Sequence, residues 1–482
     1  MIGRKREQEI LWDLYDRGNL QLVAIYGRRR VGKTYLVNET FRGKISFSHS
    51  GISPLEIEQG DKQDDKSLLP AQLEAFYRSL IKEGFQGKKP QDWWEAFDDL
   101  EKVLDQKTEK RLLVFLDEIQ WMDTPKSSFL AAFDSFYNLY GNKKGNLMVI
   151  LCGSSTSWMM NKIVNNHGGL YDRVTRQIPL APFSLEECKE YALSLGIDWS
   201  DYDLACCYMA LGGIPYYWNY LSSKLSLSQN LDEMFFSKQA PLAGEFSRLF
   251  SSLFSQPEEM EQLVRTLAKK RRGLTQEEIC KALHWNKGGT LTNRLKALEA
   301  GDFILRYVSF GEAKREPLYK LIDPFCLFYL TFVDTRTTVG DGAWLKISSS
   351  PKGYAWRGLA FENVCFHHIQ QIKSALGISG VSTSASLWAK KGNDEDRGSQ
   401  IDLLLERADN VCDACEIKFV EGEFEVDKDY HLVLADRKNA LRSVLPSKRS
   451  LQFVLICTYG LKKNPYSSDF PYVITLEDLF RA

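Results

Sequence analysis

Apolar runs of strand length alternate with helical patterns in the first third of the chain. Residues 20–27 form one such run, and residues 33–41 follow it with apolar positions at helical spacing. Two more apolar runs, residues 112–116 and 146–153, continue the alternation. Because strands that alternate with helices build parallel sheets, the pattern predicts an α/β domain over residues 1–180.

The pattern becomes more helical after this domain. Polar insertions surround the helical stretches of residues 51–110, which we interpret as decoration of the core, and residues 181–250 predict a helical lid. Three amphipathic helices and a two-strand hairpin around Gly311 then predict a winged helix-turn-helix over residues 251–334. A helix followed by strands indicates a last α/β domain over residues 335–482.

The third helix of the winged-helix pattern has one apolar and one polar face. Leu291, Leu295 and Leu298 recur at helical spacing. Arg294 and Lys296 lie on the opposite face. Two interpretations stay open: the polar face enters a DNA groove, or the module packs inside the protein and the charged face is only solvated.

A glycine-rich loop joins the first predicted strand to its helix. It reads Gly27-x-x-x-x-Gly32-Lys33-Thr34, the Walker A pattern in the strand–loop–helix context that it requires. Backbone N–H groups of such a loop surround the β-phosphate of ATP, the lysine reaches the β- and γ-phosphates, and the threonine binds Mg²⁺. The expected nucleotide-binding residues of the loop are Gly27, Arg30, Val31, Gly32, Lys33 and Thr34.

Two acids end the second apolar run. Asp117 and Glu118 follow five apolar residues, which is the Walker B pattern of a buried strand with carboxylates at its carboxyl end. We expect Asp117 to hold Mg²⁺ through water and Glu118 to polarise the water that attacks the γ-phosphate.

Polar residues follow the next two strand patterns less specifically. Ser154 ends the third apolar run, where it is either a sensor beside the γ-phosphate or an ordinary helix N-cap. Arg173 and Arg176 precede a further short strand. Either is an arginine finger, acting in its own site or in a neighbour's, or a solvated surface arginine.

Four charged residues of the last domain have the spacing of a metal-dependent hydrolase. Asp402 lies in one strand pattern and Glu416-x-Lys418 in the next, where alternation places Glu416 and Lys418 on one face. If the strands pair, Asp402 lies beside Glu416. The two carboxylates would then bind Mg²⁺ together with Glu362 of the preceding helix, and Lys418 would stabilise or activate the hydrolytic water.

Composition limits the class of protein. The 482 residues include 62 basic and 63 acidic side chains, so any nucleic-acid surface is a local patch. We find no apolar run long enough to span a membrane and expect a cytoplasmic protein. Ten scattered cysteines agree with a reducing compartment. The Cys412-x-x-Cys415 pair has no second pair at zinc spacing, and we expect it to be buried.

Several segments together resemble the archaeal-type ATPase family of the AAA+/STAND kind. In order over residues 1–225 they are MIGRKREQEILWDLY, GRRRVGKT, LDEIQWM, LYDRVTRQIPLAPFS and ALGGIPYYW. The resemblance implies that Gly3 and Arg4 line the nucleotide base. It also implies that Pro215, in a Gly-Gly-x-Pro turn, belongs to a lid motif that senses the nucleotide.

The resemblance extends to the last domain. A PD-(D/E)XK nuclease domain is the usual C-terminal partner in this family, and the order helix, strand with Asp, strand with ExK resembles that core. The proline of the pattern is missing, because Gln400 and Ile401 precede Asp402. An active nuclease and a degenerate nuclease-like fold both stay open.

The expected protein is therefore α/β. It combines a P-loop NTPase parallel sheet, a helical lid, a winged helix-turn-helix and a restriction-endonuclease-like α/β domain. We expect ATP and Mg²⁺ as cofactors and DNA as a partner of the last two modules. A homo-oligomer is one assembly that stays open. Our main hypothesis couples ATP hydrolysis to a Mg²⁺-dependent nuclease-like domain. The alternatives are an ATP-dependent signalling switch and a DNA-binding regulator with an inactive docking domain.

Overall fold

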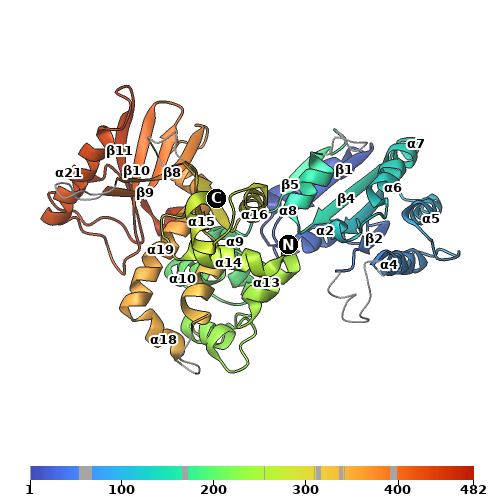
Figure 1. Ribbon diagram of the computed structural model, residues 1–482, viewed down its shortest axis with the longest axis horizontal. Coiled ribbons are helices and arrows are strands. Elements are labelled where there is room, and N and C mark those ends of the chain that lie inside the picture. The colour runs from blue at the N-terminus through green and yellow to red at the C-terminus, as the bar shows by residue number, and fades with distance from the viewer. Residues whose placement is uncertain are drawn as a thin grey trace. The chain divides into compact units, whose positions relative to one another are not determined.

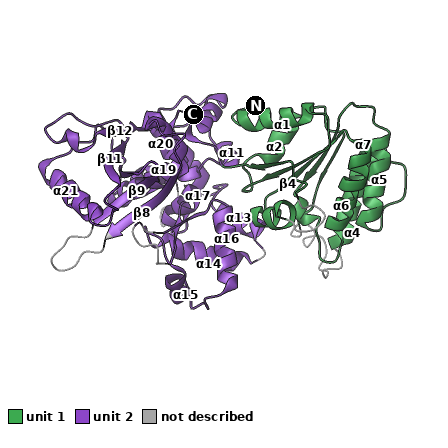
Figure 2. Cartoon of the chain, turned by 90° about the horizontal axis from the view of Figure 1, so that it is seen from above, with its two compact units in different colours: residues 1–181 green, residues 182–482 purple. Residues whose placement is uncertain are grey.

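The computed structural model divides the chain into two compact units, residues 1–181 and 182–482 (Figure 2). The structure describes residues 2–53, 68–165, 172–254, 256–308, 310, 316–335, 340, 342–390 and 399–481. The predicted hairpin turn at Gly311 lies outside these residues, as do the polar insertion at 54–67 and part of the segment before Arg173. In the described ranges, no helix is long and apolar enough to cross a membrane.

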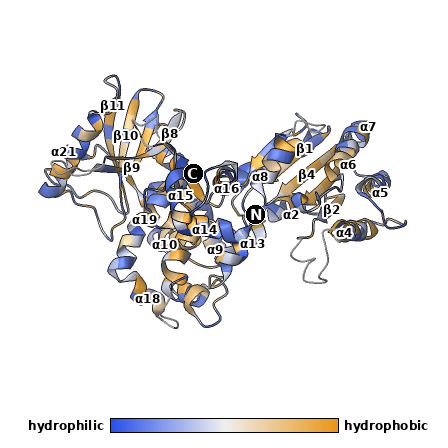
Figure 3. Ribbon diagram, viewed as in Figure 1, coloured by the Kyte–Doolittle hydropathy of each residue, from blue (hydrophilic) through white to orange (hydrophobic). Residues whose placement is uncertain are grey.

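The first unit is built on a parallel sheet with the strand order β2-β3-β4-β1-β5. The strands are β1 (Gln21–Tyr26), β2 (Phe47–Ser50), β3 (Leu112–Asp117), β4 (Leu147–Gly153) and β5 (Arg176–Pro179). Every residue of β1, β3 and β4 is buried. Strands that are covered on both faces need apolar side chains at every position, which is why they read as continuous apolar runs (Figure 3). The predicted α/β core is confirmed.

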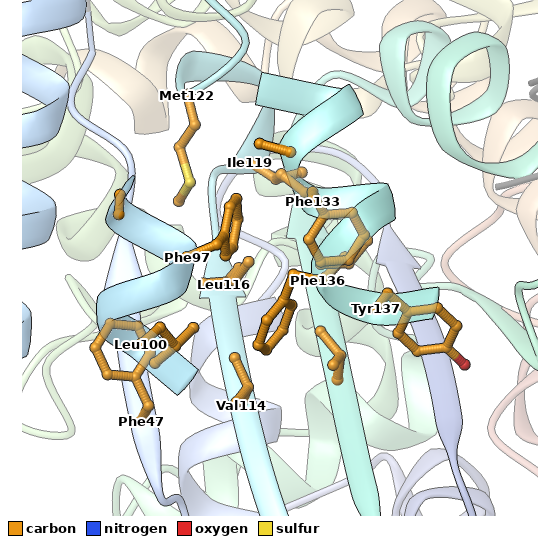
Figure 4. Close-up of a cluster of buried hydrophobic side chains, with 14 of the residues drawn as sticks. Phe47, Phe97, Leu100, Val114, Leu116, Ile119, Met122, Phe133, Phe136 and Tyr137 are labelled. Carbon is orange, nitrogen blue, oxygen red and sulfur yellow. The ribbon is translucent and has the colours of Figure 1, made fainter. Parts of the chain in front are cut away.

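Helices cover this sheet. They are α1 (Lys5–Asp16), α2 (Lys33–Thr40), α4 (Leu68–Lys82), α5 (Trp93–Asp105), α6 (Phe129–Ser135), α7 (Asn142–Lys144) and α8 (Thr156–Trp158), with the short helical segments η2 (Ile119–Trp121), η3 (Phe136–Gly141) and η4 (Met159–Val164). Phe97 of α5 packs against Phe133 and Phe136 over β3 (Figure 4). Trp93 of α5 is also fully buried. Our interpretation of residues 51–110 as decoration was therefore wrong for α4 and α5, whose aromatic faces supply much of this core.

The second unit begins with a helical region (Figure 1), and the segment for which we predict a winged helix follows it. The helices of the first part are α9 (Leu185–Ser194), α10 (Asp201–Leu211), α11 (Pro215–Trp218), α12 (Leu227–Leu231) and α13 (Glu245–Leu253), with η5 (Asp232–Phe236). The second part consists of α14 (Pro257–Ala268), α15 (Gln276–Leu283), α16 (Gly289–Ala300) and the antiparallel strands β6 (Ile304–Tyr307) and β7 (Leu318–Leu321).

A mixed sheet with the order β12-β11-β10-β9-β8 completes the second unit. Its elements are α17 (Pro324–Phe328), η6 (Tyr329–Val333), α18 (Ala343–Ser348), α19 (Pro351–His367), α20 (Ile369–Ala375), β8 (Thr383–Lys390), β9 (Ser399–Arg407), β10 (Val411–Lys418), α21 (Lys428–Arg442), β11 (Ser450–Cys457), η7 (Ser467–Asp469), β12 (Tyr472–Thr475) and α22 (Leu476–Leu479). Strands β8, β9 and β10 form an antiparallel meander, and β11 joins β10 in parallel. Cys412 and Cys415 are buried in β10, as expected.

The strands of the predicted winged helix pack on this mixed-sheet domain. Tyr307 and Leu318 of the wing strands form an apolar cluster with Leu387 of β8, and Phe366 of α19 packs beside it. The domain boundaries that we placed at residues 250 and 334 thus fall within one compact unit, and they stay predictions.

Candidate nucleotide site and carboxylate cluster

The Walker A loop connects β1 to α2. Lys33 begins α2, and its Nζ donates hydrogen bonds to the carbonyl oxygens of Gly27 and Arg28, at 2.9 and 3.0 Å. Burial lowers the pKa of this ammonium. Gly27 has φ +151°, and a Cβ there would lie 2.3 Å from the carbonyl oxygen of Leu180. A glycine is therefore required where the backbone of the loop passes closest to the chain beyond β5.

The Walker A threonine and the Walker B aspartate meet above the sheet. The Thr34 hydroxyl donates to Asp117 Oδ2 at 2.6 Å, and Asp117 Oδ1 accepts from the N–H of Glu118 at 2.9 Å. Burial raises the pKa of Asp117, although the bond from Thr34 opposes the shift. A hydroxyl and a carboxylate at this separation are the hard oxygen donors that Mg²⁺ prefers, so the predicted pair fits the metal.

Glu118 is held in one orientation. Its backbone is left-handed, with φ 47°, and its Oε2 accepts hydrogen bonds from Ser154 Oγ at 2.6 Å and Gln120 Nε2 at 2.5 Å. Gln120 also donates to Ser154 Oγ at 3.0 Å. Ser154 is not the N-cap of α8, since that position belongs to Ser155. Gln120 belongs to no motif that the sequence reveals, and only its place two residues after Glu118 marks it.

Arginines surround the loop. Arg28 is buried, and Arg29 lies over the Trp121 ring, 5.9 Å from its centroid. Arg30 has φ +70°. Arg4 donates to the carbonyl oxygens of Val31, at 3.3 Å, and Ala181, at 2.6 Å. The N-terminal segment, in which Gly3 is also left-handed, is thereby tied to the Walker A loop.

Arg173 lies away from the Walker A loop within the first unit, and Pro215 lies outside that unit. Val23 of β1 pairs with Arg176 of β5 in parallel register. Arg173 therefore precedes the amino end of β5, at the sheet edge opposite to the Walker A loop, and its charge acts on Tyr137. Pro215 belongs to the second unit, where it is the first residue of α11.

The predicted hydrolase residues are neighbours in the second unit. Asp402 Oδ2 accepts a hydrogen bond of 3.1 Å from the N–H of Ile417, between Glu416 and Lys418. Glu416 is fully buried. Its carboxylate accepts from Arg437 Nη1 at 2.6 Å, Tyr430 Oη at 2.9 Å and Lys418 Nζ at 3.4 Å.

The third predicted metal ligand has cationic partners instead. Glu362 of α19 forms an ion pair with Arg271 and lies 3.7 Å from Lys320 Nζ. Among the residues that the structure describes, no three His, Cys, Asp or Glu side chains are grouped to hold one metal ion. Guanidinium and ammonium groups neutralise these acids in the structure, and the three-carboxylate set of Glu362, Asp402 and Glu416 stays a prediction.

Arg294, on the polar face of α16, has partners within the second unit. Arg294 forms an ion pair with Glu259 of α14, and its guanidinium lies 4.9 Å from the centroid of the Trp285 ring. Its side chain is only 15% exposed. Of the two interpretations that we left open for this face, packing inside the protein describes the Arg294 side chain.

Comparison with known proteins agrees with the geometry of the first unit. Residues 1–221 match the model of a family described as an ATPase domain predominantly from Archaea. An uncharacterized protein of Methanocaldococcus jannaschii is 24% identical over 408 residues, which are 84% of this chain and 83% of that protein.

One solved structure shows a likeness in fold. The Walker-type ATPase of Pyrococcus abyssi superimposes with a TM-score of 0.50 at 18% identity, over 69% of this chain and 96% of that one. The ORC2 protein of Aeropyrum pernix has a TM-score of 0.42 at 15% identity, over 72% and 95% of the two chains. The Walker residues described above lie inside the family match, so this part of the chain is an ATPase domain.

Proposed function

We propose, on the premise that residues 1–221 form an ATPase domain, that Lys33, Thr34 and Asp117 hold ATP with Mg²⁺ and that Glu118 activates water. The observation that carries this is the hydrogen bond of 2.6 Å between Thr34 and Asp117, which joins the two Walker motifs. Bound Mg²⁺ would neutralise charge on the β- and γ-phosphates. Ser154 and Gln120 orient the Glu118 carboxylate, and Lys33 offsets phosphate charge.

Removing the lysine ammonium tests this assignment. We expect Lys33→Ala to abolish ATP turnover, measured as phosphate release, because the Lys33 ammonium is the cation that would contact the β- and γ-phosphates. Lys82→Ala removes an exposed lysine of α4 and is the matched control, expected to keep wild-type turnover. Turnover in Lys33→Ala at the level of this control would contradict the site.

A second function concerns the mixed-sheet domain. We propose that the nucleotide state governs a nuclease-like centre at Asp402, Glu416 and Lys418. The bond from Ile417 N–H to Asp402 supports this, because it brings the aspartate strand into register with the ExK strand. The ion pair of Glu416 with Arg437 instead favours the alternative, a docking domain without catalysis. Both versions leave the ATPase assignment unchanged.

Cleavage assays separate these two versions. Supercoiled, linear and single-stranded DNA and RNA are incubated with Mg²⁺, with and without ATP. Cleavage by the wild type that is lost in Glu416→Gln and kept in Glu423→Gln, an exposed control, supports a nuclease. No cleavage under any condition, with ATP turnover intact, supports the docking domain.

A further inference from the structure

A guanidinium from the winged helix contacts the acids of the mixed-sheet domain. Arg271 lies in the turn after α14, and its guanidinium forms an ion pair with Glu362 of α19. A second contact, from Arg271 Nε to Glu362 Oε2, measures 3.3 Å. The same guanidinium lies 3.7 Å from Asp402 Oδ1 of β9. One cation thus bridges two carboxylates from different elements.

Lys320 of β7 adds a second cation from the wing. Its Nζ lies 3.7 Å from Glu362 Oε2, and its side chain is only 2% exposed. Within the described ranges, this ammonium has no hydrogen-bond partner. It lies 4.9 Å from the centroid of the Phe366 ring. A buried ammonium is therefore directed at the carboxylate that Arg271 contacts.

Glu416 and Glu362, the two glutamates of the carboxylate cluster, are neutralised by cations from different parts of the second unit. Glu416 is paired with Lys418 and Arg437, both from the mixed-sheet domain itself. Glu362, whose side chain is 2% exposed, has its two ion-pair contacts with Arg271 and Lys320 of the winged helix. A buried carboxylate needs a nearby cation to remain charged, and a divalent metal ion satisfies that need as well as a guanidinium does.

The two winged-helix cations differ in exposure. The Lys320 side chain is enclosed, whereas that of Arg271 is 53% exposed. Arg271 therefore covers the carboxylates from the solvent side, and it can swing into water without opening the core.

We propose that Arg271 is a removable plug, which occupies the cation position between Glu362 and Asp402 and keeps a divalent metal ion out until the turn after α14 withdraws. Only the consequence of the plug rests on the proposed nuclease-like centre, since withdrawal of Arg271 would then permit cleavage of nucleic acid. The plug itself concerns metal binding alone.

Calorimetric titration of the full-length protein with Mn²⁺, in the absence of nucleotide, tests the plug. We expect Arg271→Ala to bind Mn²⁺ at least about tenfold more tightly than the wild type, because Glu362 and Asp402 lose the guanidinium between them and Lys320 faces Glu362 alone. Lys270→Ala removes an exposed charge one residue earlier and should match the wild type. The gain should vanish in the double variant Arg271→Ala with Glu362→Gln, which identifies the carboxylate.

Equal Mn²⁺ affinity in Arg271→Ala and Lys270→Ala overturns the plug. If Arg271→Ala does not fold, Arg271→Gln keeps the length and polarity of the side chain and carries the same expectation. The cleavage assay on these variants separates the two proposals. Tighter metal binding without cleavage keeps the plug and rejects the nuclease, whereas cleavage without a change in metal affinity rejects the plug alone.

Discussion

Single side chains around Glu118 determine where its carboxylate points. A left-handed backbone turns the residue at the end of β3, and Ser154 and Gln120 bind the same carboxylate oxygen. Oε1 remains the oxygen to which a water molecule would be presented. Glu118, the general base that we propose for this site, is thus positioned by two neutral donors, which leave its negative charge intact.

Removal of the Ser154 hydroxyl should separate catalysis from binding. We expect Ser154→Ala to lower kcat roughly tenfold, because a misdirected carboxylate loses part of its contribution as a base, while the KM for ATP stays close to that of the wild type. Ser155→Ala is the matched control, since that side chain makes no capping hydrogen bond. A rise in KM with unchanged kcat would instead assign Ser154 to nucleotide binding.

His368 predicts how stability depends on pH. Its Nε2 accepts from the N–H of Leu185 at 2.9 Å, and burial lowers its pKa to about 4. The pKa of His368 is lower in the folded state than the value of 6.5 for the unfolded chain. The stability that the neutral imidazole contributes is therefore fully present above pH 6.5 and is lost as the pH falls toward 4.

Between pH 6.5 and 4 we expect protonation of His368 alone to lower the free energy of unfolding by about 3 kcal/mol. Urea unfolding between pH 4 and 7.5 measures it, with the second unit followed separately. His368→Gln should flatten the dependence, and His284→Asn, which changes an exposed histidine, should not. An unchanged slope in His368→Gln would show that other groups carry the acid sensitivity.

A site residue can be predicted from the sequence when its partner is near in sequence or when the end of a strand fixes its position. The Walker residues follow directly from the apolar runs of β1 and β3, so the sequence was sufficient to place them. Arg271 and Lys320 reach Glu362 across 91 and 42 residues, respectively, and a basic turn or a wing lysine has no pattern that reveals such a partner. Long side chains of this kind acquire their role only from tertiary packing.

At the scale of elements, α19 contains two glycines with opposite surroundings. Gly353 is capped by Ser350, and a Cβ on it would lie 2.5 Å from the carbonyl oxygen of Ile347. A Cβ on Gly358 would meet no atom within 4 Å. One glycine permits α18 and α19 to approach each other, while the other only weakens the helix.

The same substitution should therefore have opposite effects at these two positions. We expect Gly358→Ala to raise the free energy of unfolding by about 1 kcal/mol, because alanine restricts the unfolded chain and favours the helix. Gly353→Ala should lower it by roughly 1–3 kcal/mol, through a clash with backbone that cannot yield. Equilibrium unfolding of both variants checks this, and effects of equal sign would contradict the packing at α18.

Elements were predictable from sequence wherever one physical signal dominated. Fully buried strands and the capping box of α15, from Thr275 to Glu278, could be located in this way. Residues 68–105 could not, because their aromatic residues are separated by polar ones at helical spacing and reveal their burial only when α4 and α5 pack on the sheet. The contact between β8 and the strands β6 and β7 could not be predicted for the same reason, because it forms only when these elements pack together.

At the scale of the whole molecule, the family match and the packing divide the chain at different places. The match runs to residue 221, whereas the first compact unit ends at residue 181. Between them lies α10, whose residues from Cys207 to Leu211 are all buried. This helix packs against α17 and α19, which come more than a hundred residues later.

Fragments that end at these two residues should behave differently. We expect the fragment of residues 1–181 to be monomeric and the fragment of residues 1–221 to self-associate, because α10 loses the helices that cover its apolar side chains. Size-exclusion chromatography with light scattering distinguishes the two. A monomeric 1–221 fragment would show that α9–α11 find sufficient burial without the rest of the second unit.

The placement of α10 has a consequence for how such a protein can arise by recombination. An exchange that moved residues 1–221 as a block would carry α10 away from α17 and α19, and the new host would have to supply a matching apolar surface. An exchange at residue 181 would leave that surface whole but would divide the segment that matches the ATPase family. Neither breakpoint is neutral, so the ATPase domain and the second unit are expected to be inherited together.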